Sequence, residues 1–407
     1  MGAALTSGPA WADTAPAANT WTLLPLPERT SSPVFALAVD PQDANRVLVG
    51  TPSGHLYRST QGGASWDLVG SGLGRGVLTL AFDPSHQGTV LAGTRGGGIW
   101  RSVDGGTSWS RDAGTEGRTV RSFVLGSPLA VAGTDTGVLV SSQGGSWTPA
   151  GLNQVAVSAV ALPTPSRLLV GGDQTRLNDP LPLYASPDGG HTWQPSTGSA
   201  GGSSIVSALA AAPGGTGNQN APLVMGTNTG LFTSADGGAT WKAVAGGGGL
   251  PATDYTSVAF AAGNPGHFYV ASDGGASPQG GLWSTSNGGG AFTSLKPPVA
   301  SVTALAASTD SQPALYVATF RPIDQAVMLW EYRDAGGTPQ APVGGVPKPA
   351  AGPASPPPAA PATARTPGDW LKAVLQGPEA PYLVLGLLAV VVMLVAGVAY
   401  LRRARDL

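Results

Sequence analysis

The sequence contains no cysteine among its 407 residues. Disulfide frameworks, thiolate metal sites and cysteine nucleophiles are therefore excluded together. Charged side chains are also scarce, since Asp, Glu, Lys and Arg make up 11% of the chain and leave a formal net charge of −2. A chain without excess positive charge offers no surface that attracts a polyphosphate, so nucleic acid is not an expected partner.

Histidine is rare as well, and its four copies lack the spacing of metal ligands. They lie far apart in the chain, at His55, His86, His191 and His267. Gly-rich strings such as 93–98 (GTRGGG) lie between two strand-like runs and open no helix, so they predict hairpin turns rather than a phosphate loop. The sequence therefore predicts neither a metal site nor a bound cofactor.

Glycine, proline and apolar residues are abundant instead. The chain has 61 Gly and 37 Pro, and 42% of its residues are hydrophobic. This composition excludes a helical bundle and a wholly disordered chain, and the chain is long enough to bury a large core. We therefore expect a globular body rich in turns.

One phrase recurs at intervals of about 40 to 50 residues, and we call each copy a repeat turn. The full copies are SVDGGTSW at 102–109, SPDGGHTW at 186–193 and SADGGATW at 234–241; weaker copies are STQGGASW at 59–66, SSQGGSW at 141–147 and TSNGGGAF at 285–292. Ser and Asp side chains can bond the backbone of their own turn, Gly allows positive φ, and Trp buries a large area between sheets. The residues expected to play these parts are Ser102, Asp104, Gly106 and Trp109, then Ser186, Asp188, Gly190 and Trp193, then Ser234, Asp236, Gly238 and Trp241.

The runs before each repeat turn alternate with a period of two, as strands do. They define seven units that begin near Val34, Val77, Val120, Val157, Ile205, Tyr255 and Val302. Four strands per unit predict an all-β, seven-bladed β-propeller over residues 19–333. The last unit ends at Arg333 without a fourth strand, and the run at 20–25 (TWTLLP) matches the missing one. We therefore expect the N-terminal strand to close the ring and remove its free edges.

The pattern S-x-D-G-G-x-T-W resembles the Asp-box, or BNR repeat, of sialidases, sortilin-type receptors, xyloglucan hydrolases and the photosystem II stability and assembly factors. The resemblance covers Trp21 to about Arg333. It implies a propeller, and it is most similar to the assembly factors and the sortilin-type propellers. The box is structural in all these families, so it implies no particular activity.

The predicted connections fall on two faces. The turn face carries the repeat turns and the turns between first and second strands, whereas the loop face carries the loops between second and third strands and those between blades. By resemblance, ligands use the loop face, where 171–182 and 271–281 are long enough to shape a pocket. The candidate ligand residues are Arg95, Asp135, Asp173, Arg176, Asp179, Asp273, Arg321 and Asp324, with Arg75, Glu116, Arg118 and Asp254 considered beside them.

These residues favour a non-catalytic binding or assembly module for a protein or polysaccharide. The alternative is a surface glycoside hydrolase, either sialidase-like or xyloglucanase-like. Such enzymes need two carboxyl groups at a defined separation, or an Arg cluster with an activated Tyr. The body has only three Glu, at Glu28, Glu116 and Glu331, although a pair such as Asp135 and Asp173 is conceivable. No residue is assigned a catalytic role.

The C-terminal end predicts a membrane anchor. Residues 334–380 form a Pro/Ala/Gly-rich linker, expected to be a semi-rigid stalk. Residues 381–401 follow as a transmembrane helix, because 382–401 lack any charge and twenty residues rise by about 30 Å. The tail 402–407 contains three Arg and is expected to be cytoplasmic. A single-pass protein of the cell membrane follows, with its propeller outside.

Export of the body requires a signal, and residues 1–18 contain only the end of one. Ala10, Trp11 and Ala12 form a small-x-small cleavage pattern, but a basic region and a full apolar region are missing. We interpret 1–18 as the remnant of a signal peptide whose start lies upstream of Met1. The alternative is a disordered arm, in which case the body of a tail-anchored protein would face the cytoplasm.

Overall fold

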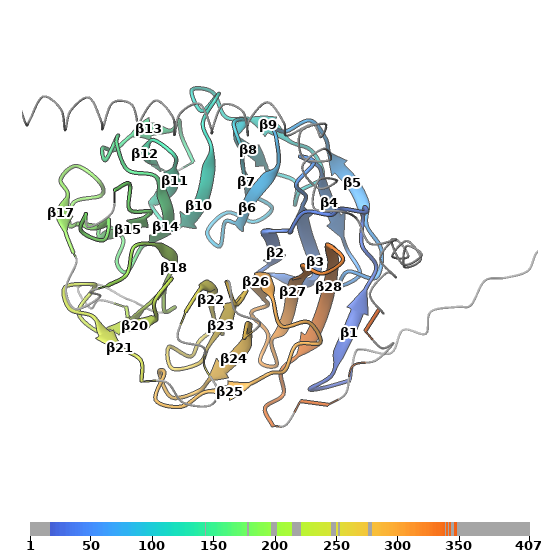
Figure 1. The fold of residues 1–407 in the computed structure, drawn as a ribbon. Helices are drawn as coiled ribbons and strands as arrows, with labels where there is room; N and C mark the ends of the chain where they lie inside the picture. Colours follow the sequence, from blue (N-terminus) through green and yellow to red (C-terminus); the bar gives the residue numbers. More distant parts are fainter. Residues whose placement is uncertain are drawn as a thin grey trace, which may run out of the picture. The chain divides into compact units, whose positions relative to one another are not determined.

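The computed structural model describes residues 17–142, 144–176, 179–196, 202–213, 221–245, 250, 253–275, 279–337, 339–340, 342 and 346–347. Within them, 28 strands form seven four-stranded antiparallel sheets, arranged in a ring with one strand of each sheet nearest the centre (Figure 1). The predicted all-β, seven-bladed propeller is confirmed. The predicted transmembrane helix, the tail and most of the linker lie outside the described residues, as do residues 1–16.

Six blades are built from consecutive strands. Blade 1 consists of β2 (Ala36–Asp40), β3 (Asp43–Gly50), β4 (Leu56–Ser59) and β5 (Asp67–Gly70); blade 2 of β6 (Val77–Phe82), β7 (Val90–Thr94), β8 (Gly98–Ser102) and β9 (Ser110–Arg111); blade 3 of β10 (Val120–Leu125), β11 (Leu129–Thr134), β12 (Gly137–Ser142) and β13 (Thr148–Pro149). Blade 4 consists of β14 (Val157–Ala161), β15 (Leu168–Gly172), β16 (Leu183–Ser186) and β17 (Gln194–Pro195); blade 5 of β18 (Val206–Ala211), β19 (Leu223–Thr227), β20 (Leu231–Ser234) and β21 (Lys242–Ala243); blade 6 of β22 (Tyr255–Phe260), β23 (Phe268–Ser272), β24 (Gly281–Thr285) and β25 (Thr293–Ser294).

Blade 7 joins the two ends of the propeller. It consists of β26 (Val302–Ala307), β27 (Ala314–Arg321), β28 (Ala326–Arg333) and, on the outside, β1 (Trp21–Leu24). Trp21 pairs with Tyr332 and Leu24 with Leu329, so β1 extends the sheet from its free edge. The Trp21 ring is fully buried, and its Nε1 donates to the carbonyl of Leu295 in blade 6 at 2.8 Å. The closure that the sequence predicts is present.

Apolar side chains fill the space between neighbouring blades. Leu91 and Ile99 of blade 2, for example, pack in one buried cluster with Val120 and Leu139 of blade 3. The burial of such faces is the main force that holds seven similar sheets in a ring. Among the residues that the structure describes, no helix has the length and hydropathy needed to cross a bilayer.

Side chains bond the backbone within the repeat turns. In blade 2, Ser102 Oγ donates to Asp104 Oδ1 at 2.7 Å and accepts from the N–H of Gly106 at 2.9 Å. Asp104 Oδ1 in turn accepts from the N–H groups of Thr107 and Ser108, both at 2.9 Å. Gly106 has φ +84°, which a side chain would strain. The same arrangement recurs in blade 4 around Ser186, Asp188 and Gly190 and in blade 5 around Ser234, Asp236 and Gly238.

Candidate functional site

The loop face places Asp173 and Asp179 in one cavity. The second-to-third-strand loop of blade 4 folds over a cavity of about 330 Å³ that both residues line. Pro180, Leu181 and Tyr184 contribute an apolar wall to it. The long loop predicted at 171–182 thus shapes a pocket, as expected for such an insertion.

The two carboxylates of this cavity differ in the polar contacts that they already make within the propeller. Asp173 Oδ1 lies 3.2 Å from Ser158 Oγ, whose proton is shared with a closer carbonyl, and Oδ2 lies 3.6 Å from the guanidinium of Arg121. For Asp179, the one side-chain bond within the described residues is a long one, in which Thr175 Oγ1 donates at 3.4 Å. Asp179 is therefore the acceptor in this cavity that is most available to a ligand.

Asp135 occupies the position in blade 3 that Asp173 occupies in blade 4, directly after the second strand. Its Oδ1 accepts from the N–H of Thr119 at 3.2 Å, and its own N–H donates to the carbonyl of Thr119 at 3.0 Å. Asp135 therefore ties its loop to the entry of blade 3. Each carboxylate of the conceivable catalytic pair, Asp135 and Asp173, has a partner in the propeller itself.

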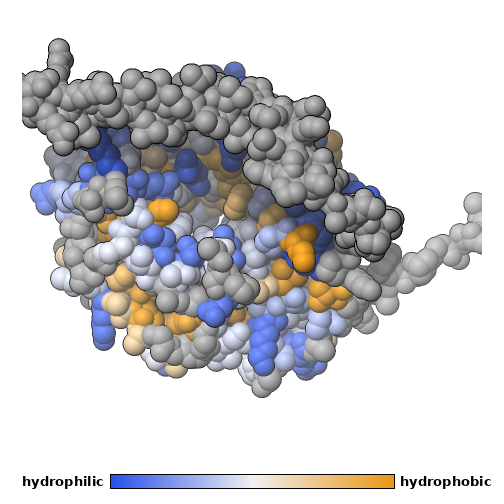
Figure 2. All heavy atoms as spheres, in the orientation of Figure 1, coloured by the Kyte–Doolittle hydropathy of each residue, from blue (hydrophilic) through white to orange (hydrophobic). Residues whose placement is uncertain are grey.

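Arg321 and Asp324 bond each other at the tip of the β27–β28 hairpin. Nε and Nη2 of Arg321 donate to the two oxygens of Asp324 at 2.9 and 2.8 Å, and Nη1 donates to the carbonyl of Pro347 at 2.7 Å. The bonds to Asp324 raise the pKa of Arg321. Each of the three guanidinium nitrogens therefore already has an acceptor, so the pair is poorly placed to bind a ligand. Ile323, in this hairpin, is 83% exposed. Figure 2 shows hydrophobic and hydrophilic residues interspersed on the face of the propeller that is in view.

Three other predicted residues lie outside the blade 4 cavity. Arg95 is exposed in the blade 2 hairpin, and Arg176 is exposed in the blade 4 loop without lining the cavity. Asp273 lies in the blade 6 loop; burial raises the pKa of its carboxyl, the N–H of Gly275 opposes that rise, and the nearby charge of Asp254 adds to it. The structure does not bring Arg95, Arg176 and Asp273 into the cavity of Asp179.

A polar network surrounds Glu28, in the loop from β1 to β2, and the sequence pattern did not predict it. Ser53 Oγ and Tyr57 OH donate to the Glu28 carboxylate at 2.5 and 3.0 Å, and His55 Nδ1 lies 2.7 Å from it. Burial alone would raise the pKa of Glu28, but hydrogen bonds from Ser53, Thr51, His55 and Tyr57 lower it to about 2. An ionised carboxylate with so low a pKa is a poor general base. The network instead fastens the ring closure to blade 1.

Metal chemistry has no support in the part of the chain that the structure describes. No three His, Asp or Glu side chains gather there in a way that could hold an ion. The four histidines lie in four different blades.

Comparison with known proteins shows similarity in fold. No protein-family model matches the chain, and no curated protein matches it. Among solved structures, the WD40 β-propeller domain of Doa1 is similar with TM-score 0.57 and 12% identity over 76% of this chain and 96% of that chain. YCF48 from Cyanidioschyzon merolae is similar with TM-score 0.54 and 16% identity over 77% of this chain and 98% of that chain.

A glycoside hydrolase is also among the similar structures. The GH74 xyloglucanase from Xanthomonas campestris has TM-score 0.54 and 15% identity over 76% of this chain, and the match spans only 55% of the enzyme's length. At such identities the similarity shows the propeller fold and nothing of the activity.

Proposed function

We propose that this protein is a non-catalytic binding or assembly module that recognises a segment of another protein on its loop face. The observation that carries the proposal is the blade 4 cavity, which joins an apolar wall of Pro180, Leu181 and Tyr184 to the available carboxylate of Asp179. A cavity of about 330 Å³ with an available carboxylate suits a side chain that has an apolar stem and a cationic end. Lysine and arginine have that form.

The bonding of the other carboxylates supports binding over hydrolysis. Glycoside hydrolysis needs a carboxyl group that holds a proton and a second one free to act as base or nucleophile. Asp135 and Asp173 are engaged with Thr119, Ser158 and Arg121 instead.

The resemblance to known propellers supports the same function. We propose that the repeat turns are Asp-boxes, since the Ser and Asp side chains bond the turn backbone in three blades. YCF48 is a propeller of similar fold, and one of its structures contains a D1 peptide. A propeller of this type can therefore bind a protein segment, and we extend that capacity to this chain. A polysaccharide is the second class of ligand that the sequence left open.

We further propose that the chain is a single-pass protein of the cell membrane, with its propeller outside and its C-terminus cytoplasmic. The support comes from the sequence, in the uncharged run 382–401 and the arginines that follow it. Protease treatment of intact cells tests this arrangement. Degradation of the propeller with survival of the extreme C-terminus is expected, and full protection of the propeller would contradict it.

The binding function can be tested with two libraries of short peptides that differ at one central position, Lys in one and Glu in the other. The full chain in detergent should select the Lys library. The variant D179N should weaken the selected peptides about tenfold, as expected for the loss of one charge-assisted hydrogen bond. The matched control is D67N, because Asp67 is exposed on β5 of blade 1, away from the cavity. Equal binding of both libraries, or no effect of D179N, would contradict the proposal.

The same protein should be incubated with xyloglucan oligosaccharides and with sialosides. No turnover is expected. Turnover that disappears in D135A or in D173A would replace the binding function with hydrolysis.

A further inference from the structure

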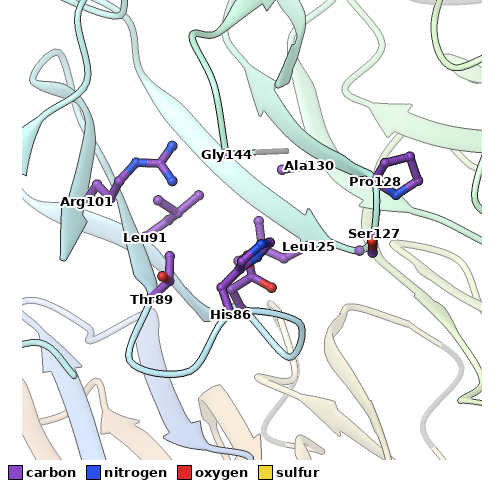
Figure 3. A pocket seen from close by; sticks show the side chains of 11 residues that line it. His86, Thr89, Leu91, Arg101, Leu125, Ser127, Pro128, Ala130 and Gly144 are labelled. Atoms are coloured by element: carbon purple, nitrogen blue, oxygen red, sulfur yellow. The ribbon is translucent and has the colours of Figure 1, made fainter. Parts of the chain in front are cut away.

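A second cavity, of about 310 Å³, lies on the turn face between blades 2 and 3. Figure 3 shows Thr89 and Arg101 of blade 2 on one side of it and Ser127 and Pro128, from the β10–β11 turn, on the other. Its apolar lining comes from Leu91, Leu125 and Ala130, which belong to the apolar cluster between the two blades. Nothing in the loop-face proposal uses this cavity.

The repeat turn of blade 3 borders the cavity and departs from the others. It has seven residues, SSQGGSW, where the full copies have eight, and it lacks the Asp. Ser141 Oγ donates to the carbonyl of Gly145 at 2.7 Å, whereas Ser102 Oγ in blade 2 donates to Asp104. Gly144 lines the cavity, and a Cβ there would lie 3.7 Å from Nη1 of Arg101. Gly144, which carries no side chain, thus lies beside the guanidinium of Arg101, and the Arg101 side chain is 17% exposed.

Hydrogen bonds from Nε and Nη2 to Asp112 hold Arg101 in place. Nε donates to both oxygens of Asp112 at 3.1 Å, and Nη2 donates to Oδ2 at 2.8 Å. Trp147 Nε1 donates to the same Oδ2 at 2.8 Å, so Asp112 is itself fixed. Within the described residues, Nη1 of Arg101 has no acceptor. A guanidinium that is fixed in this way, with a terminal nitrogen that has no acceptor among the described residues, is preorganised for an incoming oxygen.

His86 faces the cavity from the β6–β7 turn. Its Nδ1 lies 2.9 Å from Asp83 Oδ2, and Asp83 Oδ1 accepts from the N–H of Ser85 at 2.8 Å. Both oxygens of Asp83 therefore already have donors. Because Nδ1 donates to Asp83, Nε2 gains a proton only in the imidazolium form. The other charged group that lines the cavity is Arg101, and the lining that comes from blade 3 is uncharged in the described residues.

We propose that this cavity binds a carboxylate with a short apolar tail. Nη1 of Arg101 and Nε2 of protonated His86 donate to the carboxylate. Thr89 and Ser127 line the rim of the cavity, and the apolar tail packs on Leu91. The carboxylate can belong to a free short-chain acid, to an acidic side chain or to the C-terminus of a peptide. All three share the group that the donors recognise.

Butyrate is the probe for this site, and the four histidine rings are the reporters. In ¹H–¹³C spectra of the full chain, sodium butyrate should shift the His86 ring signals saturably at constant ionic strength. His55, His191 and His267 should not shift. Butyramide has the same shape without the charge, and it should bind at least about tenfold more weakly.

Two pairs of variants test the residues. R101Q should lower the affinity about tenfold, whereas R29Q, which removes an exposed charge on the loop face, should not. Since R101Q also unpairs Asp112, the second pair leaves that bond intact. S127E places a tethered carboxylate at the rim and should abolish butyrate binding, whereas S127Q should not. Equal binding of butyramide, equal shifts of all four histidines, or butyrate binding by S127E would overturn the proposal.

The source of the carboxylate is distinguished with peptides at matched concentration. The arms are butyrate, Ac-Ala-Glu-Ala-NH₂ and Ac-Ala-Ala-OH, with Ac-Ala-Ala-NH₂ as the neutral control. The arm that binds most tightly identifies the natural source as a free acid, an acidic side chain or a chain terminus. The neutral peptide should not shift His86, and a shift as large as that of the acids would count against carboxylate recognition.

Discussion

At the scale of the residue, the tryptophan that opens an outer strand connects two blades by a hydrogen bond. Trp193 Nε1 donates to the carbonyl of Ala150 at 2.6 Å, and Trp66 Nε1 donates to that of Pro25 at 2.9 Å. Each acceptor is the first residue after the outer strand of the preceding blade. The repeated Trp predicted burial, but the acceptor is a backbone carbonyl whose place depends on how two blades pack. Sequence periodicity carries no such information.

Trp109 departs from this pattern and provides a prediction about stability. Its Nε1 donates to the carbonyl of Gly106 in its own turn at 3.2 Å, and its ring is partly exposed, whereas Trp241 is 3% exposed in a buried cluster. W241A should lower the free energy of unfolding by about 3 to 5 kcal/mol through cavity formation. W109A should cost clearly less, because less of its area is buried. Denaturant melts followed by circular dichroism measure both, and equal losses would contradict the difference in packing.

The aspartates of the repeat turns predict how stability depends on pH. Hydrogen bonds from Thr192 lower the pKa of Asp188 to about 2, and those from Thr240 lower the pKa of Asp236 to about 2. Bonds from Ser108 lower the pKa of Asp104 as well. Because these values lie below that of a free Asp, the stabilisation is complete above about pH 4 and is lost as the pH falls towards 2. D104N/D188N/D236N should therefore lose less stability than the parent between pH 7 and pH 3.

Blade 6 provides the matched control for this prediction. Asn287 holds the Asp position there, accepting from Thr285 Oγ1 and from the N–H of Ala291, both at 2.9 Å. An Asn can therefore hold such a turn, and N287D should make the protein more sensitive to acid. Thermal melts at pH 7 and pH 3 give the comparison. Parallel pH profiles for the parent and both variants would contradict the argument.

At the scale of the element, the inner strands are joined by hydroxyl groups that the sequence pattern did not single out. Ser158 Oγ donates to the carbonyl of Val206 at 2.7 Å, and Thr303 Oγ1 donates to that of Val34 at 2.7 Å. Each bond runs from the inner strand of one blade to the next blade, to the first residue of β18 in one case and to a residue just before β2 in the other. The number of blades and the closing strand could be predicted, because they follow from the period and from a missing fourth strand. The hydroxyl bonds between inner strands could not be predicted. Ser and Thr also occur near the start of strands where their hydroxyl groups bond no neighbouring strand.

The closing strand gives a prediction at the same scale. A chain that lacks residues 1–26 leaves the β28 edge unpaired, and Trp330 and Tyr332, which are fully buried in the closed ring, lose the cover of β1. It should self-associate at micromolar concentration, as unpaired edges do. A peptide of residues 17–27 should restore the monomer, as measured by sedimentation velocity. The same peptide with W21A should fail, because Trp21 supplies both the buried ring and the bond to Leu295. Rescue by either peptide alike would show that Trp21 is dispensable for closure.

At the scale of the whole molecule, the seven sheets define two faces whose cavities have opposite chemistry. The loop-face cavity offers the carboxylate of Asp179, and the turn-face cavity offers the donors of Arg101 and His86. The sequence predicted the loop that shapes the first cavity, because its length exceeds a hairpin. The second lies beside a repeat turn that is one residue short, and the residues that line it come from blades 2 and 3, between Asp83 and Gly144. Such a convergence depends on the packing of two blades, which the pattern of one blade does not specify.

Because the two cavities lie on opposite faces and in different blades, occupancy of one should leave the other unchanged. The ring between them is a packed apolar core, which transmits strain only where side chains rearrange. Saturating butyrate should therefore change the affinity for a selected Lys-containing peptide by less than about twofold, a coupling below about 0.4 kcal/mol. D179N should weaken peptide binding about tenfold without altering the butyrate response of His86. S127E should abolish the butyrate response without altering peptide binding. Calorimetric titration of each ligand with and without the other measures the coupling, and a change well beyond twofold would show that the ring couples the two sites.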